Sequence, residues 1–337
     1  MCFLIFLQIV IDLIIQMKKL FLITTISVFS IIFFACSNTN ENKKLIIFHA
    51  GSLSVPMKEI AEAFEAENPG VEILMEAAGS RECAKKITDL NKECDVMVSA
   101  DYVVINNLLI PDFADWNIKF AGNEMTVVYR DQSKFSDEIN DTNWFEILQR
   151  EEVLYGRSDP NSDPCGYRAV LTMRLAEKYY KKENLAATLM AKDNNYMRPK
   201  ETDLLGLLET GAIDYIFLYK SVAIQHKLKY IVLPDSINLK KEELTDWYAT
   251  VSVDVTGKKP GEVITHIGEP MVYGITQVKN APNPELAEKF INFMLSEKGM
   301  AIIEKNGQPS MIPSFTETYE KIPEGLKSFA KPLKKIE

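Results

Sequence analysis

Two Gly-Ser pairs follow apolar, strand-like runs and precede helix-like ones: Gly51-Ser52 and Gly79-Ser80. A glycine lets the backbone turn sharply or approach a ligand, and a serine adds a hydroxyl donor. A helix that follows offers free N–H groups and the positive end of its dipole. One such serine is most simply a helix cap. Two of them in one α/β unit predict an oxyanion site that needs no lysine or arginine.

A third segment with chemistry is Asp163-Pro164-Cys165. An aspartate before a proline is typical of a helix N-cap, and this is the simplest interpretation of Asp163. Cys165 could be a thiolate nucleophile whose pKa is lowered by the helix dipole. The three histidines of the chain are scattered, and none is placed by its spacing to act as a base, so catalysis by Cys165 is not favoured.

Two single residues, Glu201 and Tyr219, stand at the start of a predicted helix and at the end of an apolar run. Taken alone, they are a solvated charge and a half-buried aromatic residue.

The charge balance restricts the partners. A net charge of −9 argues against nucleic acid and supplies no long-range field that would attract an anion. Any bound anion must therefore be held by local dipoles.

Residues 1–36 form a predicted secretory leader. Residues 20–35 are nearly uncharged and apolar, Met17-Lys18-Lys19 precedes them, and Ala35-Cys36 looks like a lipobox in which Cys36 receives the lipid. A transmembrane anchor is the alternative. Met17 is a better start than Met1, because the run from Met1 has nothing basic at its front. The polar residues 37–44 are predicted to be a flexible tether.

Three cysteines follow the leader: Cys83, Cys94 and Cys165. A Cys83–Cys94 disulfide is conceivable outside the cytoplasm, but the predicted helix between them would hold their Cα atoms too far apart. No metal-finger spacing is present.

The elements that must position these residues alternate between strand and helix. Apolar runs at 45–50, 71–78 and 94–100 are separated by helical patterns at 55–68 and 81–90, and a third helical pattern covers 102–110. Such alternation predicts a parallel sheet with right-handed crossovers, whose ligands sit at the carboxyl ends of the strands. Both Gly-Ser turns, and Asp101-Tyr102, fall at that edge.

A second α/β unit lies between two extended runs, 124–130 and 271–278. We expect these runs to cross between lobes, with the helical C-terminal region returning to the first. The predicted lobes are 45–122 plus 276–337, and 125–270. The fold class is therefore α/β with two lobes, and a cleft between hinged lobes is the natural ligand site.

The motifs in this order resemble the tungstate/molybdate-binding lipoproteins of oxyanion ABC importers: LIIFHAGSL, EAAGS before CDVMVSADY, SDPCGYR, IDYIFLYKSVA and EPMVYGIT. The resemblance covers almost all of residues 45–313. It implies a type II periplasmic-binding-protein fold, a monomer with no cofactor and no catalysis, and an extracytoplasmic, lipid-anchored location beside an ABC permease. It places the ligand contacts on Gly51, Ser52, Ser80, Asp163, Pro164, Cys165, Glu201 and Tyr219.

Asp163 and Glu201 should repel an anion, so the resemblance implies that they touch its metal. Tungsten(VI) and molybdenum(VI) accept further oxygen ligands, whereas the sulfur of sulfate does not. The alternatives are the same fold binding sulfate, phosphate or ferric ion, and, further off, a Cys165-dependent enzyme. Ferric binders need a tyrosine pair or histidine ligands, and Tyr219 has no evident partner in the sequence.

Overall fold

The computed structural model describes residues 16–18, 43–257, 259 and 261–333. Its contacts separate Met1–Asn42 from Lys43–Glu337, and the fold lies in the second unit. Apart from a helical stretch at 16–18, the predicted leader, Cys36 and the tether up to residue 42 lie outside the described residues. Among the described residues, no helix combines the length and the apolar character that crossing a membrane requires.

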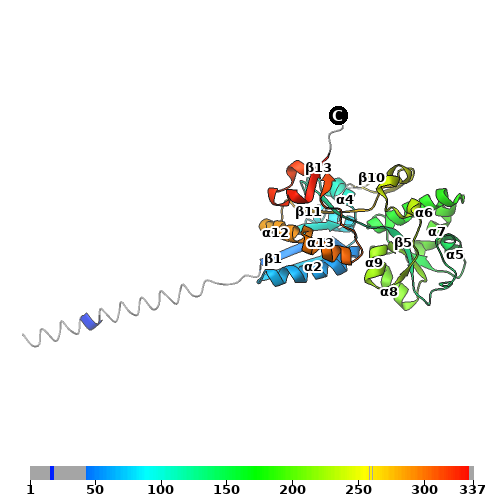
Figure 1. Ribbon diagram of the computed structural model, residues 1–337, viewed down its shortest axis with the longest axis horizontal. Helices are drawn as coiled ribbons and strands as arrows, with labels where there is room; N and C mark the ends of the chain where they lie inside the picture. Colours follow the sequence, from blue (N-terminus) through cyan, green and yellow to red (C-terminus); the bar gives the residue numbers. More distant parts are fainter. Residues whose placement is uncertain (1–15, 19–42, 258, 260, 334–337) are drawn as a thin grey trace, which may run out of the picture. The chain divides into compact units, whose positions relative to one another are not determined.

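The first lobe is built on a five-stranded sheet in the order β2-β1-β3-β11-β4 (Figure 1). Strands β1 and β2, and β1 and β3, are parallel, as the alternating pattern predicts, whereas β11 runs antiparallel to β3 and β4. The sheet is therefore mixed, because β11 enters from the second lobe. Its strands are β1 (Lys43–Ala50), β2 (Val71–Ala78), β3 (Val96–Ser99), β4 (Ile118–Gly122) and β11 (Val272–Gln277).

Both faces of this sheet are covered. In β1, Ile47 packs into one apolar cluster and Phe48 into another, and in β3 Val98 and Met97 do the same. Burial on both faces explains why these strands read as unbroken apolar runs.

The helical elements are η1 (Gly51–Leu53), α2 (Ser54–Glu67), α3 (Ser80–Thr88), α4 (Tyr102–Val104), a π-turn η2 (Ile105–Leu109), α12 (Pro284–Leu295), α13 (Glu297–Lys305), η5 (Tyr319–Lys321) and η6 (Glu324–Phe329). A short parallel pair, β12 (Ser314–Thr316) and β13 (Ala330–Pro332), completes this lobe.

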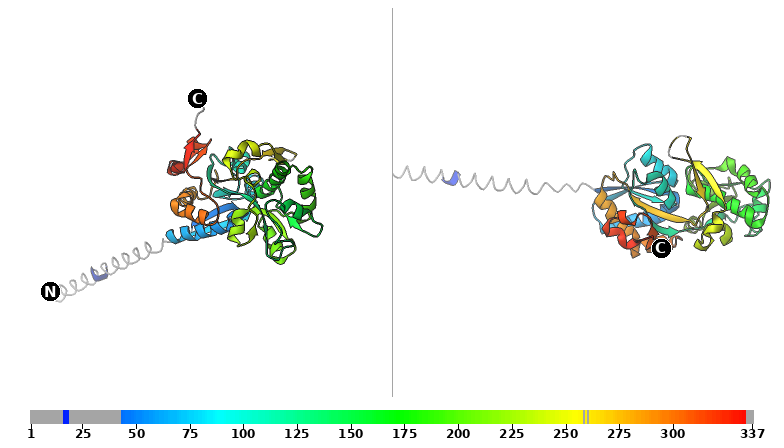
Figure 2. Two further views of the ribbon diagram at one scale, coloured as in Figure 1. Left: turned by 45° about the vertical axis from the view of Figure 1, so that its right-hand side comes forward. Right: turned by 90° about the horizontal axis from the view of Figure 1, so that it is seen from above.

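The second lobe has a four-stranded sheet in the order β6-β7-β5-β8 and an antiparallel hairpin, β9–β10 (Figure 2). Its strands are β5 (Met125–Tyr129), β6 (Tyr155–Gly156), β7 (Tyr215–Tyr219), β8 (Lys229–Tyr230), β9 (Ser252–Thr256) and β10 (Val263–Ile267). Its helices are α5 (Trp144–Gln149), α6 (Pro164–Tyr180), α7 (Leu185–Asp193), η3 (Asn194–Tyr196), α8 (Asp203–Thr210), α9 (Lys220–Gln225), α10 (Asp235–Asn238), η4 (Glu242–Leu244) and α11 (Thr245–Tyr248).

Some elements differ from the sequence prediction. β1 begins at Lys43, two residues inside the predicted tether, because Lys43 and Lys44 pair with Val71 and Glu72. The predicted boundary at residue 276 falls inside β11, all of which pairs in the first sheet. Cys83 and Cys94 are free thiols, both buried, as the helix between them led us to expect.

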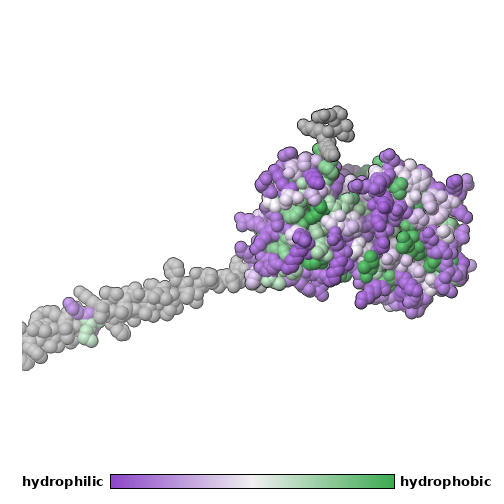
Figure 3. Space-filling view, in the orientation of Figure 1, coloured by the Kyte–Doolittle hydropathy of each residue, from purple (hydrophilic) through white to green (hydrophobic). Residues whose placement is uncertain are grey.

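The lobes meet through backbone as well as side chains. The N–H of Glu82, in the first turn of α3, donates to the carbonyl of Ser162 at 3.1 Å. A Cβ atom on Gly79 would lie 2.3 Å from that carbonyl oxygen, so only glycine fits this contact. The face of the Lys43–Glu337 unit that Figure 3 shows is mostly hydrophilic.

Candidate functional site

The two predicted serines lie fully buried at the carboxyl ends of β1 and β2. The Oγ atom of Ser80 accepts a hydrogen bond from the N–H of Ala100 at 2.9 Å. The Oγ atom of Ser52 lies 3.0 Å from the hydroxyl of Tyr273. Neither serine side chain caps its own helix, so the cap interpretation of these serines is wrong.

The carboxylate of Asp163 has two structural roles. Its Oδ1 atom accepts from the N–H of Cys165 at 3.1 Å, which is the N-cap that the Asp-Pro order predicts. Its Oδ2 atom accepts from the N–H of Glu201 at 2.9 Å, which holds Glu201 beside it. One side chain therefore begins α6 and places the second carboxylate.

Glu201 reaches across to the first lobe. A Cβ atom built on Gly51 would lie 3.0 Å from its Oε2 atom and 3.1 Å from its Oε1 atom, so the carboxylate rests against the Gly51 backbone. Only 1% of Glu201 is exposed, yet neither of its carboxylate oxygens has a hydrogen-bond partner in the described part of the chain. An isolated buried carboxylate is costly and needs a compensating partner.

Burial dominates the electrostatics of this pair. Loss of water raises the pKa of Glu201 well above its usual value, and the nearby Asp163 raises it further. Burial also raises the pKa of Asp163, although the backbone N–H groups of Cys165 and Glu201, which donate to its carboxylate, oppose this. Burial therefore disfavours the charged form of both carboxyl groups unless a partner compensates it.

Cys165 is placed as a structural thiol. Burial, and then the charge of Asp163, raise the pKa of Cys165 well above its usual value, and its Sγ atom donates to the carbonyl of Phe217 at 3.8 Å. Burial therefore outweighs the helix dipole at Cys165, and the thiolate alternative, which the sequence did not favour, gains no support. The N–H groups of Cys165 and Gly166 both donate to Asp163. A ligand contact through Pro164 or Cys165 stays a prediction.

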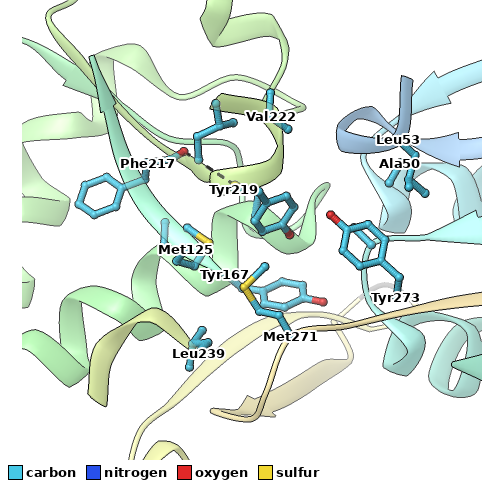
Figure 4. Packing of buried hydrophobic residues seen from close by; sticks show 14 of the residues in the cluster. Ala50, Leu53, Met125, Tyr167, Phe217, Tyr219, Val222, Leu239, Met271 and Tyr273 are labelled. Atoms are coloured by element: carbon cyan, nitrogen blue, oxygen red, sulfur yellow. Dashed lines mark hydrogen bonds between the residues drawn. The ribbon is translucent and has the colours of Figure 1, made fainter. Parts of the chain in front are cut away.

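Tyr219 ends β7 and faces a second tyrosine that the sequence did not reveal. Its ring centroid lies 6.3 Å from that of Tyr273 in β11, and Figure 4 shows the two hydroxyls directed into the space between the rings. The expectation that Tyr219 lacks a partner is therefore wrong, since β11 supplies one from the other lobe. Burial raises the pKa of Tyr273 to about 12 and that of Tyr219 well above its usual value, so both phenols stay protonated.

Other buried polar residues also surround the site. Asn123 donates to the hydroxyl of Tyr273 at 2.8 Å, and Arg168 donates to the hydroxyl of Tyr219 at 3.1 Å. Ser158 is fully buried, and its Oγ atom has no hydrogen-bond partner in the described part of the chain.

The arrangement thus joins hydroxyl donors from both lobes to two carboxylates. Among the described residues, no three histidine, cysteine, aspartate or glutamate side chains gather as a metal-ion site. A surface pocket of about 480 Å³ lies elsewhere, lined among others by Tyr102, Lys119 and Glu269, and contains none of the predicted ligand contacts. The buried site can therefore donate hydrogen bonds from hydroxyl groups and offer carboxylate oxygens from Asp163 and Glu201.

Two lobes with a buried polar site between them define a solute-binding protein. The chain belongs to the bacterial extracellular solute-binding protein family, whose model matches residues 45–308. It is 54% identical over 291 residues to a solute-binding protein of Petrotoga mobilis, covering 86% of this chain and 90% of that protein. It is 44% identical over 317 residues to the molybdate/tungstate-binding protein WtpA of Pyrococcus abyssi, covering 85% of this chain and 90% of that protein.

Solved structures agree on the fold. The periplasmic molybdate-binding protein of Azotobacter vinelandii superposes with a TM-score of 0.59 at 16% identity, covering 80% of this chain and 99% of that one. The resemblance in the sequence to a two-lobed, type II binding protein is confirmed.

Proposed function

We propose that this protein captures tungstate or molybdate outside the cytoplasm and delivers it to the permease of an ABC transporter. The observation that carries the proposal is the buried Glu201 carboxylate, which lies beside Asp163 and opposite the serine turns and has no hydrogen-bond partner among the described residues. The relative in Pyrococcus abyssi, named for both anions, supports it.

In this proposal the two kinds of group have different tasks. The hydroxyls of Ser52, Ser80 and Tyr219 donate to the oxygens of the anion, and Asp163 and Glu201 bind the metal. Two like unit charges about 4 Å apart repel by about 4 kcal/mol at an effective dielectric near 20. A tetrahedral anion that cannot take more oxygens meets this repulsion, whereas tungstate and molybdate offset it by forming metal–oxygen bonds. The carboxylates therefore exclude sulfate and phosphate.

The finer features of the proposal concern the whole chain. We infer a monomer that performs no catalysis, attached to the membrane by a lipid on Cys36. The lobe boundaries that we propose follow the sheets: 45–122 with 272–337, and 125–270, with the crossings at 123–124 and 270–271 as hinges.

Titration calorimetry on residues 37–337 tests the proposal. We expect tight binding of tungstate and molybdate and no heat from sulfate, phosphate or ferric ion. Equal affinity for sulfate would contradict the role of the carboxylates. X-ray absorption on the tungstate complex should report more than four oxygens around tungsten, and four would leave Asp163 only as a helix cap.

A further inference from the structure

Arg168, in the second turn of α6, connects the candidate site to the other lobe. Its side chain is buried, and its Nη1 atom donates to the carbonyl of Ala100 at 2.6 Å and to the hydroxyl of Tyr219 at 3.1 Å. Its Nη2 atom forms an ion pair with Asp101 at 3.2 Å. Ala100 and Asp101 follow β3 in the first lobe, whereas Tyr219 ends β7 in the second. One guanidinium therefore contacts both lobes at once.

The contact with Tyr219 has a fixed direction. A guanidinium has donors and no acceptor, so the oxygen of Tyr219 must accept this hydrogen bond. The proton of Tyr219 must then point elsewhere, and in the described part of the chain no acceptor for it is recorded. Figure 4 shows the hydroxyl directed into the space between the Tyr219 and Tyr273 rings.

Asp101 holds the guanidinium in place. Its Oδ2 atom also accepts a short hydrogen bond from the hydroxyl of Tyr167, and its Oδ1 atom accepts from the N–H of Val103 at 3.0 Å. Asp101 is itself buried, so this ion pair is shielded from water and salt. The pair is nearly neutral overall and adds no net positive charge to the site.

We propose that Arg168 is a positioning residue that makes the Tyr219 hydroxyl a directed donor for the bound oxyanion, and that it does so only in the closed protein. The guanidinium is held by Ala100 and Asp101 only when the lobes are together. Closure therefore completes the oxyanion contacts of the second lobe. This inference rests on the proposed function, because it assigns the Tyr219 proton to that ligand.

A double-mutant cycle with tungstate, followed by calorimetry, tests the inference. Y219F should weaken binding roughly 10- to 100-fold, as expected for one hydrogen bond to a charged group. R168M should weaken binding by at least as much in the wild-type background. In the Y219F background the loss from R168M should be smaller by about tenfold, because the hydroxyl that Arg168 directs is already gone. An equal loss in both backgrounds would overturn the inference and leave Arg168 as a structural contact between lobes.

R168M leaves Asp101 buried without its ion partner and could unfold the protein, so the same cycle is run in the D101N background. There both charges of the pair are removed together, which costs less than removing one. The Ala100 carbonyl still accepts from Arg168 in that background, so sub-additivity of smaller size is expected, and additivity again overturns the inference. R174M is the matched control, because Arg174 lies further along α6 and contacts the Ser252 carbonyl instead. It should leave tungstate affinity unchanged.

Failure of the inference is distinguishable from failure of the proposed function. If the wild-type protein binds neither tungstate nor molybdate, the proposed function is wrong and this inference is wrong with it. If the wild-type protein binds tungstate and the cycle is additive, only the role of Arg168 is wrong.

Discussion

Glu201 is unfavourable for folding, and the proposed function gives it a role in binding. Its carboxylate is buried beside Asp163, and neither oxygen has a hydrogen-bond partner in the part of the chain that the structure describes, which destabilises the ligand-free protein. E201Q removes this charge with little change of shape. We expect the free energy of unfolding without ligand to rise by about 1–3 kcal/mol, measured by urea unfolding. Tungstate affinity should fall at the same time. The fold-loss in tungstate affinity should exceed the fold-loss in any residual sulfate affinity.

The opposite signs of these two effects make the test specific. E209Q is the control, because Glu209 is exposed on α8 and should change neither quantity. A less stable E201Q protein would show that the carboxylate has a structural partner after all.

At the scale of elements, the start of α3 is shaped by its approach to the second lobe. Gly79 has a φ angle of −59°, which any residue can adopt, so its backbone does not require glycine. Glycine is required because of the Ser162 carbonyl, whose oxygen would lie 2.3 Å from a Cβ atom on Gly79. G79A should therefore keep the lobes apart. We expect tungstate affinity to fall at least about tenfold, while the melting temperature of the ligand-free protein changes little.

G206A is a matched glycine control. A Cβ atom on Gly206, in the middle of α8, would meet no atom within 4 Å. This variant should stabilise the protein by about 0.5–1 kcal/mol and leave binding unchanged. Unchanged tungstate affinity in G79A would show that closure does not need this contact.

Local patterns predicted the elements well where burial is simple. The apolar runs of β1, β2 and β3 and the Asp-Pro start of α6 appear where expected, because both signals act over a few residues. The predicted helix at 102–110 instead became the short α4 and the π-turn η2. The C-terminal helical pattern is split at Ser296, whose Oγ atom caps α13 through the N–H of Gly299.

The candidate site was predicted less completely, for a physical reason. Gly51, Ser52, Ser80 and Asp163 carry local turn and cap signals. Tyr273, in contrast, reaches Ser52 from 221 positions along the chain, and Arg168 contacts Asp101 only because two lobes close. Composition and periodicity contain no information about such pairings, and the family resemblance did not name these residues.

At the scale of the whole molecule, Glu269 gives the stability a pH dependence. Burial, and then the charge of Asp101, raise the pKa of Glu269 to about 7, and the hydroxyl of Tyr102 donates to it at 3.1 Å. The folded protein therefore binds more protons than the unfolded chain between the ordinary glutamate pKa of 4.5 and about 7. The free energy of unfolding must decrease as the pH rises through this window.

We expect this decrease to be about 1–2 kcal/mol, less than the full shift implies because the side chain is partly exposed. Urea unfolding of the ligand-free protein on both sides of the window measures it. E269Q cannot titrate and should make the dependence less steep over this range, while Glu201 and Asp163, whose pKa values burial also raises, keep their own contributions. An unchanged slope in E269Q would assign the effect to another group.

The near-complete burial of Ser52, Ser80, Asp163 and Glu201 also determines exchange kinetics. A closed protein of this kind has no surface from which an anion could enter or leave. The residence time of a bound anion then depends on how often the lobes separate. Contacts to the anion lengthen this time only by making lobe separation less frequent. In the proposed function, two anions bound in the same closed form would therefore leave at rates that differ only because each slows lobe opening to a different degree.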